Sequence, residues 1–178
     1  EEKSCERFFL WAELMKAAWH ERLETVAKAA ATAVAKSALP DNGTDRERGR
    51  LQADANFILA EVAVAQMNRL AEKESAVNGG NGGGGVTAAE LLVDGSEGVE
   101  ALRSQALAAM LEGMRIGESI REEVLVHNAC VYIWNYNQPL LRAGRFEPLL
   151  PALQQAVAAL MRADQKALQA EVQLVKLA

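Results

Sequence analysis

The side chains best suited to chemistry in this chain are its two histidines and two cysteines, which are His20, His127, Cys5 and Cys130. His127 and Cys130 are three residues apart, so on a helix they share one face and could act as base and nucleophile or as two metal ligands. A catalytic pair needs a third orienting group, and a zinc site needs four ligands at recognisable spacing; neither pattern is present. We interpret both residues as core side chains and expect no catalytic residue and no metal.

A glycine run, NGGNGGGG at residues 78–85, satisfies the dinucleotide-binding pattern G-x-G-x-x-G. That pattern binds a cofactor only where a strand precedes it and a helix follows it, and no such strand is predicted. No Lys-Ser or Lys-Thr pair follows, which excludes a P-loop. Because glycine loses much backbone entropy on ordering, we predict a flexible linker over residues 78–86 and no cofactor.

The composition excludes several classes of partner. Half of the 178 residues are hydrophobic, 24% are charged, and the net charge is -5. Basic residues are scattered among acids, so no basic stripe offers itself to nucleic acid. The apolar stretches are too short for a membrane span, and two distant cysteines suit a reducing cytosol. We expect a globular cytoplasmic chain that binds neither nucleic acid nor membrane.

Helical signals run through the whole chain. Apolar residues recur every three or four positions, alanine is abundant, and no segment is typical of a strand. The predicted helices cover residues 4–19, 21–38, 46–76, 87–92, 94–116, 119–142, 146–162 and a last helix capped by Asp164. Thr87 and Glu90 match a capping box. The fold class is therefore all-α.

These helices must position any functional residue, and the linker divides them into two segments. The first helical-repeat segment is predicted at 1–77, and the second at 87–178 around the central helix 119–142. The chain ends within an apolar helical pattern, so we expect it to be a fragment of a longer protein.

The central helix contains a run without Asp, Glu, Lys or Arg between Val124 and Leu141. Charged residues are rarely buried unless they are paired, so this run predicts a buried helix around which others pack. Its aromatic residues Tyr132, Trp134 and Tyr136 could instead face a partner, but core packing is the favoured interpretation.

Antiparallel helix pairs with short turns invite comparison with the tetratricopeptide pattern. In the first pair, Trp11 and Leu14 occupy the expected positions, on one predicted side with Phe8, Met15, Ala18 and Trp19. Later segments keep the helix-turn-helix rhythm without the consensus. We therefore predict an irregular, TPR-like α-solenoid of antiparallel helix pairs.

One segment is similar to a known family. VHNACVYIWNYN at 126–137, followed by LRAGR at 141–145, resembles a repeat helix of the large solenoid proteins of the central-pair apparatus in motile cilia. These are cilia- and flagella-associated proteins of the forty-six or fifty-four type. The resemblance implies a non-enzymatic scaffold that braces a microtubule-attached projection in the axoneme.

The resemblance also implies the partners, which are other axonemal projection proteins and, indirectly, microtubules in a large hetero-complex of the cytoskeleton. A cytosolic adaptor that binds a peptide or helix is the alternative, and a helical-bundle enzyme using His127 and Cys130 is the remote one. The predicted interaction or core-packing residues are Trp11, Trp19, Tyr132, Trp134, Tyr136, Arg142, Arg145 and Phe146.

Overall fold

The computed structural model describes residues 2–38, 45–78 and 87–177. Within these ranges the regular structure consists of α-helices, and no strand is present, which confirms the all-α prediction. The helices are α1 (Glu2–His20), α2 (Glu24–Ala35), α3 (Arg46–Asn78), α4 (Ala88–Val93), α5 (Glu97–Ser119), α6 (Glu123–Tyr136), α7 (Gln138–Arg142) and α8 (Leu150–Leu177). The predicted glycine-rich linker falls almost entirely on 79–86, outside the described residues.

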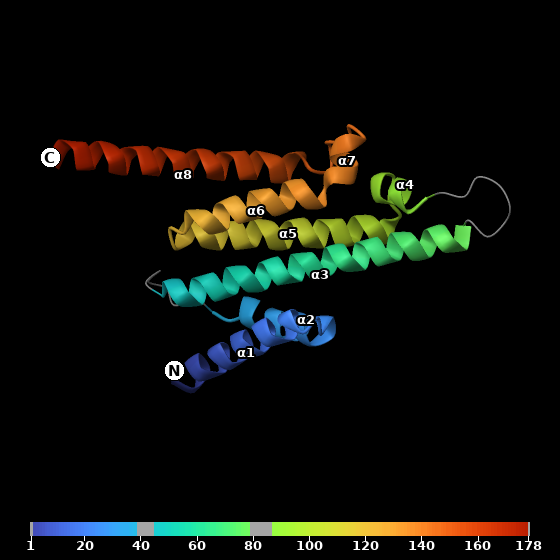
Figure 1. Ribbon diagram of the computed structural model, residues 1–178, viewed down its shortest axis with the longest axis horizontal. Coiled ribbons are helices and arrows are strands. Elements are labelled where there is room, and N and C mark those ends of the chain that lie inside the picture. The colour runs from blue at the N-terminus through green and yellow to red at the C-terminus, as the bar shows by residue number, and fades with distance from the viewer. Residues whose placement is uncertain (1, 39–44, 79–86, 178) are drawn as a thin grey trace.

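The long helices lie side by side, and each runs opposite to the one before it (Figure 1). The α1–α2 pair packs on α3, the most extensive contact joins α3 to α5, and α6 packs on the other side of α5. Helix α8 covers α5 and α6, while the short α4 lies against α3 and α7. The first and last helix pairs therefore form the two outer layers.

Helix α3 is buried on two sides and joins two hydrophobic cores. One side packs with α1 and α2 through Leu51, Ala55, Ile58 and Val62. The other side packs mainly with α5, and less extensively with α4 and α6, through Ala53, Phe57, Ala60, Val64 and Met67. Burying a Val, Leu, Ile, Phe or Met side chain stabilises the fold by about 1.5–3 kcal/mol, so α3 contributes to holding both halves together.

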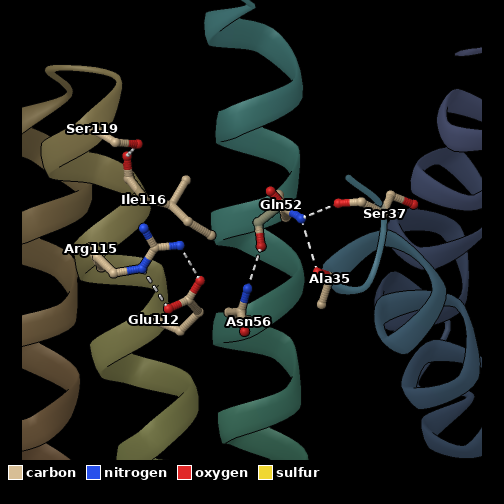
Figure 2. Close-up of polar contacts among 8 residues, drawn as sticks. All are labelled: Ala35, Ser37, Gln52, Asn56, Glu112, Arg115, Ile116 and Ser119. Atoms are coloured by element: carbon tan, nitrogen blue, oxygen red, sulfur yellow. Dashed lines mark hydrogen bonds and ion pairs between the residues drawn. The ribbon is translucent and has the colours of Figure 1, made fainter. Parts of the chain in front are cut away.

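Polar side chains also hold α3 to the end of α2. The Gln52 amide donates to the carbonyl oxygens of Ala35 and Ser37 at 2.9 and 2.7 Å, as Figure 2 shows. One turn further on, the Asn56 amide donates to the Gln52 carbonyl at 2.9 Å. Gln52 therefore satisfies carbonyls that the end of α2 leaves without partners.

Three helices end in the same kind of turn. The second residue past the helix is left-handed, and the following amide donates to a carbonyl five residues back, which is the Schellman arrangement. The left-handed residues are Arg22 (φ 57°), Arg121 (φ 59°) and Gly144 (φ 72°). The amide-to-carbonyl bonds join Leu23 to Ala18, Glu122 to Gly117 and Arg145 to Leu140 at 2.8, 2.9 and 3.0 Å. This turn reverses the chain after α1, α5 and α7.

The predicted central helix 119–142 is wrong in its bounds, because α6 and α7 are separate helices that meet at Asn137. Pro139 lies in the first turn of α7. Proline has no amide hydrogen and its ring clashes with the preceding turn, so one helix does not pass through it undisturbed. Asn137 is buried at the break, and its side-chain amide donates to the Ile133 carbonyl at 2.8 Å.

The last two predicted helices, 146–162 and the one capped by Asp164, are a single helix, α8. No Gly or Pro interrupts the sequence at that point, and Asp164 is simply an exposed residue within the helix. At the other end α8 begins at Leu150 rather than at Phe146. The Phe146 carbonyl accepts the Leu149 and Leu150 amides, both at 2.9 Å, in the turn before α8.

The predicted capping box is confirmed. The Thr87 amide donates to the Glu90 carboxylate at 2.7 Å, and the Glu90 amide donates to the Thr87 hydroxyl at 3.2 Å. Helix α5 begins later than predicted, because its cap is Ser96 and not Asp94. Asp94 instead ends α4.

Candidate functional site

A groove of about 370 Å³ lies between α1, α3 and α6. Helix α1 contributes Lys16, Trp19 and His20 near its end, α3 crosses the floor, and α6 adds Asn128 and Tyr132. The remaining lining residues are Met15, Asp54, Phe57, Ile58 and Glu61. The groove therefore combines three aromatic rings with two carboxylates.

Ring contacts position the aromatic side of the groove. The Phe57 and Tyr132 rings meet edge to face with centroids 5.3 Å apart, and Tyr132 stacks on Tyr136 at 5.7 Å. Such pairs stabilise a structure by about 0.5–1.5 kcal/mol beyond the area they bury. Gly113 of α5 lies behind the Phe57 ring, where a Cβ would approach the Cε1 atom to 2.5 Å. The missing side chain at Gly113 lets the ring lie close to α5.

Asp54 and Glu61 supply the carboxylates. They are seven residues apart on α3, which places them on one face two turns from each other. Burial raises the pKa of both carboxyls above their ordinary values. Glu61 shares a hydrogen bond with the Tyr136 hydroxyl, and burial together with the Glu61 charge raises the pKa of Tyr136 to about 12.

Neither carboxylate has an ion pair within the part of the chain that the structure describes. The nearest cations are engaged elsewhere: Lys16 pairs with Glu13 at 3.0 Å, and Arg50 pairs with Glu122 at 2.8 Å. Both cations still lower the pKa of Asp54 through space, but burial dominates and the net direction is upward. The groove thus holds two partly desolvated carboxylates that make no ion pair among the described residues, although Lys16, which also lines it, acts on Asp54 through space.

The structure brings three of the predicted interaction residues together here, since Trp19 and Tyr132 line the groove and Tyr136 stands behind it. Asp54 and Glu61 were missed by sequence reasoning. The available signal was two acids seven residues apart in DANFILAE, with no other charged residue between Arg50 and Arg69.

The other predicted residues lie elsewhere. Trp134 is 55% exposed, so the prediction that it packs in the core is wrong. Arg142 is exposed, and Arg145 pairs with Asp94 across the α4–α7 contact. Phe146 is half exposed in the turn before α8. Trp11 is 42% exposed on the outer side of α1, as is Leu14, and neither is on the packed side.

The remaining correction concerns His127 and Cys130, which do not both lie in the core. His127 is exposed, and its Nδ1 is 2.8 Å from the Glu123 carbonyl oxygen. The Cys130 thiol points toward the Ala156 carbonyl of α8 at 3.9 Å, and burial raises its pKa. A raised pKa favours the thiol over the thiolate, which is the opposite of what a cysteine nucleophile needs.

Apolar side chains also gather on the two outer layers. Helix α1 exposes Leu10, Trp11 and Leu14, which line a surface depression with Arg7. At the opposite layer, α6 exposes Val124, Val131 and Trp134, while α8 exposes Leu150, Val157 and Met161. We call the first set the α1 face and the second set the α6–α8 face. Within each helix these residues recur at spacings of three, four or seven positions, which places them along one side of that helix.

Among the described residues, no group of three or more His, Cys, Asp or Glu side chains is placed to hold a metal ion. No described helix is both long enough and apolar enough to cross a membrane. No protein-family model matches the chain, and no match is found to a curated protein or to a solved structure.

Proposed function

We propose that this chain is a non-enzymatic structural scaffold that works through protein–protein contacts. The observation that carries the proposal is the pair of apolar stripes on opposite outer layers of the helix stack. Contiguous exposed apolar surface marks protein interaction sites, and tryptophan is enriched among the residues that dominate binding energy. Trp11 and Trp134 are thus the expected anchors of the two faces.

The arrangement of helix pairs supports a repeat architecture for this scaffold. The pairs α1–α2, α3–α5 and α6–α8 pack one on the next, as stacked repeats do. In a solenoid each repeat contacts only its neighbours, so the outer pairs offer apolar surface to further protein. We infer an irregular, TPR-like α-solenoid in which the α1 and α6–α8 faces are the docking surfaces.

We place this scaffold in a ciliary or flagellar axoneme, on a projection of the central-pair microtubules that motility needs. The support is the resemblance of 126–137 and 141–145 to the central-apparatus solenoid proteins. The partners are then other projection proteins, and microtubules are reached through them. Val131 and Trp134, the exposed large hydrophobic residues of 126–137, lie on the α6–α8 face.

The test is retention in isolated axonemes. The tagged parent protein is expected to remain in detergent-extracted axonemes of normal cells and to be lost from those of central-pair-less cells. The double substitution Trp134→Ser and Met161→Ser is expected to release it from normal axonemes. Gln155→Ser, at an exposed polar position on another side of α8, is the matched control. A tag found in the cytosolic extract of normal cells would contradict the ciliary assignment.

A second candidate, a cytosolic adaptor that binds a partner segment reversibly, is favoured by the groove between α1, α3 and α6. Its lining of aromatic rings and carboxylates is suited to a single extended segment more than to a broad flat interface. Reversible binding by the purified chain, without retention in axonemes, would favour the adaptor over the ciliary scaffold.

A further inference from the structure

We propose that the groove between α1, α3 and α6 binds the guanidinium group of an arginine presented by a partner protein. The juxtaposition that points to it is two unpaired carboxylates on α3, Asp54 and Glu61, beside the rings of Trp19, Phe57 and Tyr132. This inference rests on the protein-binding part of the proposed function, and it identifies the chemistry of the partner.

The carboxylates provide the charge argument. Carboxylates removed from water are normally paired or hydrogen-bonded, because desolvation of a charge is costly. Asp54 and Glu61 are both partly buried, and neither has an ion pair within the described residues. Glu61 accepts one hydrogen bond from Tyr136, which leaves further acceptor sites on its two oxygens. A cation entering the groove would supply the missing partners.

The aromatic rings indicate which cation the groove binds. A guanidinium stacks on aromatic faces and donates up to five hydrogen bonds in a planar fork, whereas an ammonium is a compact, strongly hydrated charge. The same chain already uses this contact, since the Arg48 guanidinium carbon lies 4.8 Å from the centre of the Phe8 ring. Trp19 and Tyr132, beside the two carboxylates, therefore favour arginine over lysine, while the buried Phe57 ring supports Tyr132 from behind.

The other titratable groups of the groove determine which charges an arginine would meet there. Lys16 and His20 of α1 line it, while Tyr132 and Tyr136 of α6 remain neutral because burial raises their pKa. Lys16 is the competing cation, because it lines the groove and acts on Asp54 through space, although its ammonium pairs with Glu13 at 3.0 Å. Neutralising Lys16 is therefore expected to strengthen binding of an arginine.

The test uses the full 178-residue chain with Trp11→Phe and Trp134→Phe, so that Trp19 is the remaining tryptophan and reports on the groove. The probe is a capped Ala-Ala-Arg-Ala-Ala peptide, with matched peptides carrying citrulline or lysine instead of arginine. Circular dichroism establishes that each variant is folded. The arginine peptide is expected to change Trp19 fluorescence saturably, and added salt is expected to weaken the binding.

Each neutralised carboxylate, in Asp54→Asn or Glu61→Gln, is expected to lower affinity about tenfold or more, because each removes a charge-assisted hydrogen bond. Glu72→Gln, an equal charge change at an exposed position of the same helix, is expected to leave affinity unchanged. Lys16→Gln is expected to increase affinity, which a purely structural role of the carboxylates would not produce.

Several results would overturn the inference. One is the absence of saturable binding of the arginine peptide to the folded chain. Another is equal affinity for the citrulline or lysine peptide, and a third is an equal loss in the Glu72→Gln control. None of these results would affect the scaffold proposal, because retention in axonemes is tested on the α6–α8 face, at Trp134 and Met161.

Discussion

Substituting Gly113 by alanine tests how closely α5 packs on α3. A Cβ at this position would lie 2.5, 2.9 and 3.0 Å from the Cε1, Cζ and Cδ1 atoms of Phe57. Real Cβ contacts do not reach the shortest of these distances, so the ring or the helix must shift. Phe57 is only 5% exposed, and its ring also contacts Tyr132, which leaves it little room to move.

Two opposing terms set the size of the effect. Alanine favours a helix interior over glycine by about 1 kcal/mol. Overpacking a core costs about 1–3 kcal/mol, and we take about 3 kcal/mol because the ring is buried and contacts other residues. The expected net loss is about 2 kcal/mol in the free energy of unfolding. For a chain of this size, that loss lowers the melting temperature by about 4–8 °C.

The assay is urea and thermal unfolding followed by circular dichroism, with a double-mutant cycle. In the Phe57→Leu background, which lacks the Cε1 and Cζ atoms, Gly113→Ala is expected to become neutral or to stabilise by about 1 kcal/mol. Gly98→Ala, also in α5, serves as the control, because its Cβ would meet closely just the flexible end of Leu70, with the Ser96 hydroxyl at an ordinary 3.9 Å. An equal loss with and without the Phe57 ring would refute the reasoning.

Further predictions concern turns, charges and one buried cation. Gly144→Ala should lower stability by about 1 kcal/mol in urea unfolding, because a Cβ there meets no atom within 4 Å and only the left-handed backbone (φ 72°) is penalised. Arg121→Gly (φ 59°) should raise stability by about 0.5–1 kcal/mol in the same assay, since relief of left-handed strain exceeds the glycine entropy cost. Burial raises the pKa of Asp54, so this group binds its proton more tightly in the folded state. Stability therefore falls as the pH rises from the ordinary pKa of Asp54 through the raised one. Asp54→Asn should raise the melting temperature at neutral pH relative to the unsubstituted chain, with no such gain at about pH 3, below both pKa values. Arg103, 3% exposed, donates to the Glu100 carboxylate and the Leu92 carbonyl, so Arg103→Met should cost about 1–3 kcal/mol and speed amide hydrogen exchange in α4. An equal rise in the melting temperature of Asp54→Asn at both pH values would contradict the first of these last two explanations. Unchanged amide hydrogen exchange of α4 in Arg103→Met would contradict the second.

Local signals in the sequence predicted the helices well. Apolar periodicity and alanine content are properties of a single segment, so the all-α class and most helix positions follow from them. The Thr87–Glu90 capping box was predictable for the same reason, because it joins residues three positions apart. Of the three left-handed residues in the described part of the chain, Gly144 is the one whose residue type predicts this conformation. Arg22 and Arg121 carry no such signal, since neighbouring packing holds them in a conformation that arginine does not favour.

Only the tertiary structure decided which faces were buried. A charge-free run predicted a buried α6, yet its outer residues Val131 and Trp134 are exposed, because α6 has packed neighbours on only part of its circumference. Helix α3 carries charged residues at both ends but is buried on two sides, because the α1–α2 pair packs on one side of it and α5 on the other.

Helix packing also determined which residues form the candidate groove. Asp54 and Glu61 resemble ordinary surface acids in the sequence, and Trp19 and Tyr132 are more than a hundred residues apart along the chain. They meet because α1 and α6 lie beside the same turns of α3. Burial and proximity are relations between segments, determined by how the helices pack, and a one-dimensional pattern records only what each segment does alone.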